Sequence, residues 1–402
     1  MNQLNKLDDD SLLSKKMINE LLPGFSNVVE NSTQAMSIKY NNDVYELKTQ
    51  GLKINVLSLG EAFFDIPLFP FNNLPFPEIY HYTHSRGLPE LRRKIANHYE
   101  IRYGVSIDSE SELIITPGSK AAIYFSMLSI LNPGDEVIIH EPTWVSYPEQ
   151  VKLCHGIPVM IPYYSKVFDY EKYITEKTKL IIINNPHNPR GEVFREKELK
   201  YLVDMARANG LYVLADEAYS DFIIENNFLS LGVLDPDKRN IIICNSISKN
   251  FGISGWRLGY SIANKNLTDH MLKVNQHITT CPPSILQYYI SHYFDEIIHI
   301  THPQIISLLK KRNLIKEYMD INEIKYLEGL ATFYFFVSIA PSKLTSVEFC
   351  DYLLKEEQVC LVPGKGYGES CDSFVRLSIG SEGIAEIKSG LDALNRLIAR
   401  TS

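Results

Sequence analysis

Short runs of apolar residues alternate with longer segments of helical periodicity between residues 111 and 246. The apolar runs are rich in β-branched residues and cover 113–116, 136–140, 180–184, 212–215 and 241–244. Strands that are apolar on both faces and separated by helices are typical of a parallel sheet with helices on each side. We therefore expect an α/β fold in this part of the chain.

The pattern changes after Pro283. It becomes mainly helical, and two strand-like stretches then follow at 332–338 and 373–378, beside loops that contain Gly and Pro. This favours a second, α+β region. The segment before Gly60 is too short for a core of its own, so we expect it to pack against the carboxy-terminal region. The predicted division is an amino-terminal segment (1–60), a large domain (61–300) and a small domain (301–402).

Composition supports a globular protein that acts on small molecules. The 402 residues are 45% hydrophobic and 22% charged, and this length favours two or three domains, or one large domain with a smaller partner. The formal net charge of -8 provides no basic surface for nucleic acid, and no Lys/Arg cluster indicates a membrane-binding patch.

Cysteine spacing and the amino terminus indicate the compartment. The six cysteines form no C-x-x-C pair, and none has a His at metal-ligand spacing. Neither a disulfide framework nor a metal site is therefore expected. The first ten residues lack the apolar stretch of a signal peptide, and no apolar run approaches the roughly 20 residues that span a bilayer. We expect a cytoplasmic protein.

Polar residues follow the first two predicted strands, at the edge where open α/β sheets bind ligands. The first strand leads through Pro117 and Gly118 to Ser119 and Lys120 at the start of a helix. Free N–H groups there stabilise a phosphate, although such a turn is most often only a helix cap. Trp144 follows the second strand, either as a core residue or as an aromatic platform.

The next three strands also end in polar residues. The segment 184–191 holds three Asn, which ordinarily form Asx turns. Asp216 and Tyr219 follow the fourth strand, and Lys249 follows the fifth, among Ser246, Ser248 and Arg257. Each feature alone has an ordinary structural explanation. Together, a phosphate-binding turn, an aromatic plate, an amide, a carboxylate, a phenol and a lysine are the groups that a phosphorylated pyridine aldehyde requires.

Three of these segments carry a family resemblance. The motifs Asn184-x-Pro186-x-Asn188-Pro189-x-Gly191, Asp216-x-x-Tyr219 and Ser246 to Gly259, in this order, resemble those of the fold-type I pyridoxal-5'-phosphate (PLP) enzymes of the class I/II aminotransferase family. The resemblance runs from about Tyr40 to the carboxy terminus. It implies a mainly parallel, seven-stranded sheet in a large PLP-binding domain, and a smaller α+β domain built from both chain ends.

The resemblance also implies catalytic roles. Lys249 would hold PLP as a Schiff base and later move the proton between substrate and cofactor. Asp216 would keep the pyridine nitrogen protonated, so that the ring accepts electrons. Asn188 and Tyr219 would hydrogen-bond the ring oxygen and lower the pKa of the Schiff base.

Other positions are implied to bind phosphate, ring and substrate. The phosphate ligands would be Gly118, Ser119, Lys120, Ser246 and Arg257, with Trp144 stacked on the ring. Arg376 would bind the substrate α-carboxylate together with Gly60 and Asn188. Tyr82 matches the tyrosine that reaches the phosphate of the neighbouring subunit, which implies a homodimer with shared active sites.

The resemblance favours an aminotransferase that exchanges an amino group between an L-amino acid and a 2-oxo acid. Two departures from the family pattern, Ala62-Phe63-Phe64 after Gly60-Glu61 and Arg190 before Gly191, flank the site. A carbon–sulfur lyase or a PLP-dependent oxidase or hydroxylase is therefore the alternative. Lys120 is either a phosphate-side residue or a contact for the distal carboxylate of an acidic substrate. A PLP-sensing transcription regulator is not expected, because no basic recognition helix is visible.

Overall fold

The structure is a computed structural model that describes residues 24–223 and 228–402. It separates into two units, Met1–Thr33 and Gln34–Ser402. The described part of the first unit contains the short helix α2 (Asn27–Glu30). The remaining helices and strands belong to the second unit.

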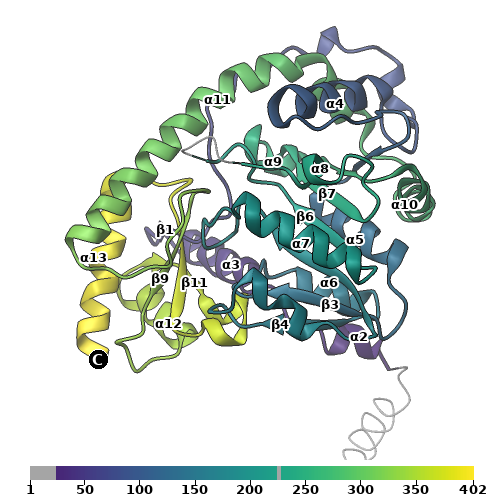
Figure 1. Cartoon of the computed structure of the whole chain (residues 1–402). Coiled ribbons are helices and arrows are strands. Elements are labelled where there is room, and N and C mark those ends of the chain that lie inside the picture. Colours follow the sequence, from purple (N-terminus) through teal and green to yellow (C-terminus); the bar gives the residue numbers. More distant parts are fainter. Residues whose placement is uncertain (1–23, 224–227) are drawn as a thin grey trace, which may run out of the picture. The chain divides into compact units, whose positions relative to one another are not determined.

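The largest sheet in this unit has seven strands in the order β2-β8-β7-β6-β5-β3-β4 (Figure 1). Its strands are β2 (Leu113–Thr116), β3 (Glu136–His140), β4 (Ile157–Ile161), β5 (Thr178–Asn184), β6 (Tyr212–Asp216), β7 (Ile241–Ser246) and β8 (Gly259–Ile262). The strands run parallel except β8, which is antiparallel to both neighbours. The expected α/β fold with a mainly parallel sheet is confirmed.

Two strands of this sheet were not expected from the sequence. β4 lies at the edge, contains Pro158 and is only partly buried, so it lacks the continuous apolar pattern of the central strands. β8 has the sequence Gly-Tyr-Ser-Ile, which is too short and too mixed in polarity to be recognised as a strand. It is nevertheless fully buried, because it pairs with β2 and β7.

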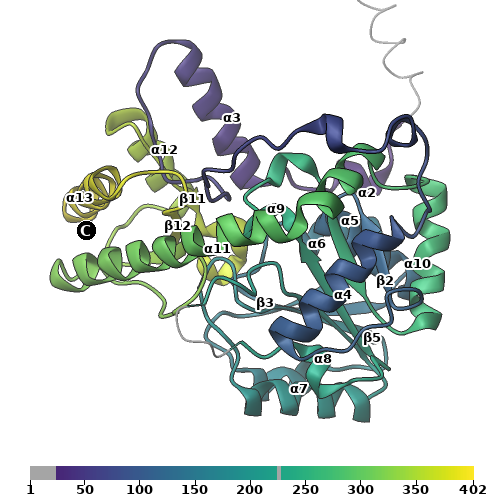
Figure 2. The ribbon, with the colours of Figure 1, turned by 90° about the horizontal axis from the view of Figure 1, so that it is seen from above.

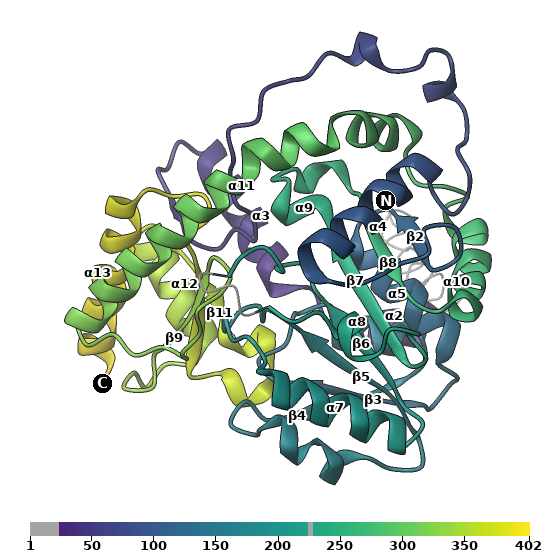
Figure 3. The ribbon, with the colours of Figure 1, turned by 45° about the horizontal axis from the view of Figure 1, so that its top comes forward.

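Helices cover both faces of the sheet, and alternate strand residues point to opposite faces. Ile138, Ile181 and Val213 contribute to one apolar cluster, whereas Val137, Ile182 and Leu214 contribute to another. The first cluster includes side chains of α4 (Pro89–Tyr103), α7 (Glu196–Ala208), α8 (Leu231–Leu234) and α11 (Ser284–Ile321). The second includes side chains of α5 (Ser119–Ile130), α6 (Tyr147–Leu153) and α10 (Lys265–Ile278). Figure 3 shows α5 and α10 together beside β2.

Residues from both ends of this unit share a third core. It contains side chains of α3 (Met36–Thr49), β1 (Asn55–Val56), β9 (Tyr334–Ser338), α12 (Ser346–Glu356), β10 (Val359–Cys360), β12 (Phe374–Ser378) and α13 (Ile384–Thr401). β11 (Val362–Pro363) contributes Val362 to a smaller, fourth cluster. β1 pairs in parallel with β10, and β9, β12 and β11 form an antiparallel sheet. The strands expected at 332–338 and 373–378 are therefore present as β9 and β12.

The long helix α11 passes from α4 to α13 (Figure 2). It is kinked at Tyr293 and crosses residue 300. The division into domains at residues 60 and 300 stays a prediction, and residues 1–23 of its first segment lie outside the described residues.

Short 3-10 helices complete the secondary structure: η1 (Phe71–Asn73), η2 (Glu78–Tyr80), η3 (Val167–Tyr173), η4 (Ser254–Trp256), η5 (Gly364–Tyr367) and η6 (Glu369–Cys371). A further short helix, α9 (Ile247–Asn250), directly follows β7. Within the described ranges, no helix combines the length and the apolar character needed to cross a membrane.

Candidate active site

A pocket of about 450 Å³ lies at the carboxyl ends of the central strands. It brings together every predicted site residue except Gly118 and Tyr82. Its lining includes Gly60, Ser119, Lys120, Trp144, Asn188, Asp216, Tyr219, Ser246, Lys249, Arg257 and Arg376. The parallel register places Asn184 beside Asp216 and Asp216 beside Cys244, so neighbouring strands end at the same edge.

Lys249 points its amine into the pocket from α9. The helix is capped by Ser246, whose Oγ accepts a 2.9 Å hydrogen bond from the amide of Ser248. The Nζ atom donates to the carbonyl oxygen of Gly60 and lies 5.9 Å from the centre of the Tyr219 ring. Burial lowers the pKa of Lys249 to about 8, and the positive charges of Arg376 and Arg257 act in the same direction.

Asp216 is the last residue of β6 and lines the pocket. Its Oδ2 accepts a 2.6 Å hydrogen bond from the Tyr147 hydroxyl, and its Oδ1 accepts one of 3.1 Å from the amide of Ala218. Burial raises the pKa of Asp216, and both hydrogen bonds act in the opposite direction because they stabilise the carboxylate.

Tyr219 lies between an amide and a second phenol. Asn188 donates from Nδ2 to the Tyr219 hydroxyl at 3.3 Å, and the Tyr334 hydroxyl lies 3.0 Å from it. Asn188 is in turn fixed by its own amide, which donates to Oδ1 of Asn184 at 2.6 Å. The Oδ1 atom of Asn188 is buried and has no hydrogen-bond partner among the described residues.

A cationic, amide-rich region forms the end of the pocket next to α5. Gly118 has a φ of 83° and directly precedes the helix, which begins at Ser119. A Cβ at Gly118 would lie 2.5 Å from Nη2 of Arg257, so only glycine lets the guanidinium approach this turn. Free N–H groups at a helix start and a nearby guanidinium are favourable ligands for a phosphate.

Lys120 and Trp144 are adjacent in the pocket wall. The Nζ atom of Lys120 lies 5.0 Å from the centre of the Trp144 ring. Burial lowers the pKa of Lys120, and the positive charge of Arg257 lowers it further. Trp144 also meets Tyr147 edge to face at 5.1 Å.

Arg376 extends from β12 and is almost completely buried. Its Nη2 donates to the carbonyl oxygen of Ser58 at 2.6 Å, and its guanidinium lies 4.6 Å from the centre of the Tyr334 ring. In residues 24–223 and 228–402, no carboxylate forms an ion pair with it. A buried arginine with a free face in a pocket is suited to a carboxylate ligand. Gly60 lies beside it, since a Cβ there would be 4.0 Å from Nη2.

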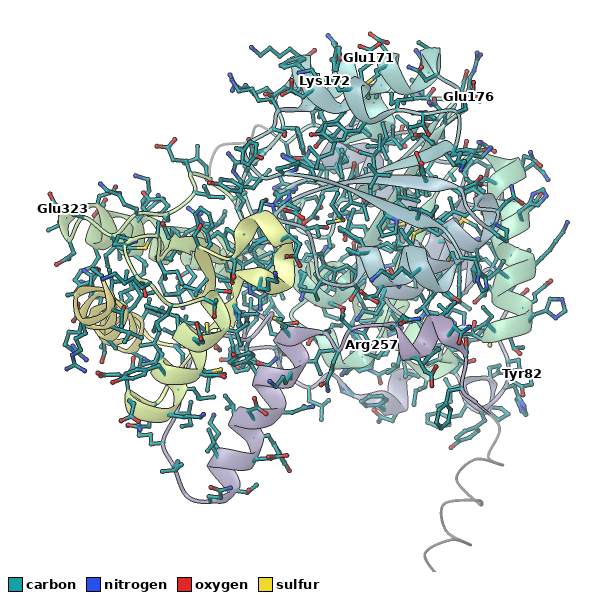
Figure 4. All side chains as sticks on the ribbon, turned by 90° about the horizontal axis from the view of Figure 1, so that it is seen from below. Tyr82, Glu171, Lys172, Glu176, Arg257 and Glu323 are labelled. Atoms are coloured by element: carbon teal, nitrogen blue, oxygen red, sulfur yellow. The ribbon has the colours of Figure 1, made fainter. Side chains whose placement is uncertain are left out.

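Tyr82 lies apart from the residues that line this pocket. It is 85% exposed, and Figure 4 labels it on the surface together with Arg257. A single chain therefore does not bring Tyr82 to the site.

Several lining residues were not singled out from the sequence. They include Glu61, Asn184 and Tyr334, and also Ser37, Ile38 and Asn41 of α3. Tyr147, which contacts Asp216, was missed as well. Glu61 directly follows Gly60, and Asn184 begins the motif at 184–191, so the sequence already places both beside predicted site residues. Tyr147 and Tyr334 carry no local signal, because their contacts are made with distant parts of the chain.

The two departures from the family pattern are not among the residues that line this pocket. Ala62 is buried in the third core and Phe63 is 62% exposed. Arg190 forms an ion pair with Glu192 at 3.2 Å and lines a different pocket. Neither departure changes the described lining of the site.

Comparisons with known proteins identify the relatives of this chain. Residues 61–394 match the family model described as aminotransferase class I and II. The chain is 36% identical over 333 residues to the aspartate aminotransferase of Sulfolobus acidocaldarius, covering 79% of this chain and 82% of that protein. It is 31% identical to the (5-formylfuran-3-yl)methyl phosphate transaminase of Methanocaldococcus jannaschii, over 88% of this chain and 94% of that protein. The aspartate aminotransferase of Thermus thermophilus, solved with maleate, superimposes with a TM-score of 0.84 at 27% identity, covering 94% of this chain and 100% of the other.

Proposed function

Because the chain belongs to the class I and II aminotransferases, a family of PLP-dependent transferases, we propose that it exchanges an amino group between an L-amino acid and a 2-oxo acid by a ping-pong mechanism at Lys249. The observation that carries this proposal is the pocket itself. A lysine amine, a buried carboxylate and a buried arginine meet there as Lys249, Asp216 and Arg376, and no carboxylate of the described residues forms an ion pair with the arginine.

The residues present fit PLP. The turn at Gly118 and the guanidinium of Arg257 suit its phosphate, with Ser119 and Ser246 beside them. Asp216 suits its protonated ring nitrogen, and the Tyr219 hydroxyl and the Asn188 amide suit its ring oxygen. Trp144 lines the same pocket and offers an aromatic face. When bound, PLP supplies a carbonyl carbon that links covalently to amines and a ring that accepts electrons.

Lys249 acts as the nucleophile and then as the base in this proposal. A pKa of about 8 leaves roughly a tenth of its amine neutral at pH 7, far more than in an ordinary lysine, and both roles need the neutral amine. Burial raises the pKa of Asp216, and the hydrogen bonds from Tyr147 and Ala218 favour its charged form, which is the form that would pair with a protonated ring nitrogen. Arg376 and Gly60 hold the substrate α-carboxylate and thereby bring its Cα hydrogen towards Lys249.

An acidic amino acid is the favoured donor. The relatives include aspartate aminotransferases, and Lys120 adds a second cation to the pocket at a position distinct from Arg376. A dicarboxylate substrate needs two such cations, one for each carboxylate.

We also propose that the protein is a homodimer in which Tyr82 completes the site of the partner subunit. The segment around Tyr82 exposes large apolar side chains, namely Leu68 at 79%, Phe76 at 51% and Tyr80 at 73%. Such a concentration of exposed apolar residues is typical of a protein–protein interface.

The test of the function is a panel of amino acids added singly to the purified holoenzyme while visible absorbance is recorded. Transamination converts the cofactor to its pyridoxamine form without a second substrate, and adding a 2-oxo acid restores the starting spectrum. Lys249→Ala is the control and should show no borohydride-fixed pyridoxyl label. Release of ammonia, sulfide or peroxide with no pyridoxamine form would instead indicate a lyase, oxidase or hydroxylase.

A further inference from the structure

Tyr334 occupies a position between the two ligand-binding parts of the pocket. Its side chain is fully buried and lines the pocket from β9. The strand is fixed by pairing with β12, where Tyr334 lies opposite Ser378 and Phe336 opposite Arg376. Its carbonyl oxygen also accepts a 3.3 Å hydrogen bond from Arg312. Tyr334 and Arg376 therefore extend from two paired strands of one sheet.

The side chain of Tyr334 contacts both parts of the site. Its hydroxyl lies 3.0 Å from the hydroxyl of Tyr219, which follows β6. Its ring lies 4.6 Å from the guanidinium carbon of Arg376. A Cβ at Gly60 would be 3.4 Å from the Tyr334 hydroxyl, so this hydroxyl also adjoins the proposed carboxylate site. Tyr334 therefore contacts both Arg376, at the proposed carboxylate site, and Tyr219, at the proposed PLP site.

The donors and acceptors around the Tyr219 hydroxyl set the direction of its hydrogen bond with the Tyr334 hydroxyl. A phenol has one O–H to donate and two lone pairs that accept. Asn188 already donates to the Tyr219 hydroxyl at 3.3 Å. If Tyr219 donates its proton to the ring oxygen of PLP, Tyr334 must be the donor in the phenol pair. The hydroxyls then form a chain from Tyr334 through Tyr219 into the pocket, and each bond in such a chain strengthens the next.

The charges around Tyr334 make this chain of hydrogen bonds sensitive to substrate binding. Burial raises the pKa of Tyr334, the positive charge of Arg376 acts in the opposite direction, and the carboxylate of Glu61 raises it further. A substrate carboxylate that binds Arg376 offsets the positive charge next to the Tyr334 ring. The Tyr334 hydroxyl then donates less strongly to Tyr219, which in turn donates less strongly to the cofactor.

We propose that Tyr334 is a positioning residue that couples occupation of the carboxylate site at Arg376 to the hydrogen bond that Tyr219 makes with PLP. The inference rests on the proposed function, since it uses the roles assigned there to Arg376 and Tyr219. Tyr334 lies on β9, outside the sequence motifs that indicate the family.

The test is Tyr334→Phe, which keeps the ring under Arg376 and removes only the hydroxyl. The pKa of the PLP–Lys249 link is read from visible absorbance as a function of pH, and the Kd of PLP for the apoprotein is measured alongside it. Loss of one neutral hydrogen bond corresponds to a rise of that pKa by about 0.4 to 1. The same substitution in a Tyr219→Phe background should cause no further rise, because Tyr334 acts through Tyr219.

Tyr367→Phe is the matched control. Tyr367 is also fully buried and lies 5.5 Å from the Arg376 guanidinium, but its hydroxyl has no partner among the described residues. Tyr367→Phe should leave the pKa of the PLP–Lys249 link unchanged. The proposal is overturned if Tyr334→Phe behaves like Tyr367→Phe, or if its effect adds in full to that of Tyr219→Phe.

A second measurement needs no variant of Tyr334. Saturating propionate, an unreactive carboxylate, should raise the pKa of the link more in the wild type than in Tyr219→Phe, and equal rises would contradict the coupling. These titrations require bound PLP but no turnover. A wild-type enzyme that binds PLP and transaminates no amino acid would therefore reject the proposed function, while the result for Tyr334 could still be read.

Discussion

The hydroxyl of Tyr147 donates a 2.6 Å hydrogen bond to Oδ2 of Asp216 in the buried base of the pocket. It comes from the first residue of α6, three positions after Trp144. The bond orients the carboxylate and favours its charged form, which is the form needed to keep a pyridine nitrogen protonated.

Asp216→Asn should keep the fold but slow the chemical step at least about tenfold, because an amide loses a charged hydrogen bond of roughly 1.5–3 kcal/mol to the ring nitrogen. Single-turnover kinetics with a Cα-deuterated amino acid measures this step. Tyr147→Phe is the control and should cost less, since the carboxylate remains. Proton abstraction at the wild-type rate in Asp216→Asn would show that the assigned role is wrong.

The apoprotein should capture PLP with a rate that rises with pH up to about 8 and then levels off. Burial lowers the pKa of Lys249 to about 8, and only the neutral amine attacks the aldehyde. Stopped-flow absorbance follows the covalent step, and Lys249→Ala gives the background. A rate that still climbs several-fold between pH 9 and 10 would indicate an ordinary lysine instead.

Mixing Tyr82 and Lys249 variants should restore activity if the active sites are shared between subunits. In a mixed dimer one site combines an intact Lys249 with an intact Tyr82, so random exchange regenerates about one quarter of the sites. Subunit exchange is verified by native mass spectrometry, and each variant is assayed alone. The absence of any recovery after verified exchange would argue against a contribution of Tyr82 across the interface.

Lys120→Ala should lower kcat/KM for glutamate at least about tenfold, because an ion pair in a partly desolvated site contributes roughly 1.5–3 kcal/mol. An uncharged donor, if accepted, should react almost as before. Lys120→Arg keeps the charge and serves as the control. Equal losses for both donors would place Lys120 at the phosphate of the cofactor.

Glu217→Gln should flatten the pH dependence of stability. Burial raises the pKa of Glu217 from 4.5 to about 8, although hydrogen bonds from Ser230 and Leu231 oppose this. The folded protein therefore retains a proton that the unfolded chain releases. This contribution is complete below pH 4.5 and is lost as pH rises to about 8, by at most roughly 1.4 kcal/mol per pH unit.

Calorimetric Tm values between pH 5 and 8 test this. The wild type should lose Tm relative to Glu217→Gln as pH rises. Parallel curves for the two proteins would show that Glu217 titrates normally.

The sequence alone determined which residues end the central strands. The apolar runs that became β3, β5, β6 and β7 are continuous because these strands are covered on both faces, so Asn184, Asp216 and Lys249 could be assigned to one edge. The motifs at 184–191, 216–219 and 246–259 are local, and their order along the chain was sufficient to indicate the family.

Only the tertiary structure decided what surrounds those residues. Tyr147 reaches Asp216 across 69 positions, and Tyr219 meets Tyr334 across 115. The antiparallel β8 and the edge strand β4 likewise depend on neighbours from elsewhere in the chain. The pattern of apolar residues indicates which face of an element is buried. Strand register and the packing of the seven-stranded and three-stranded sheets decide which side chains meet at the site.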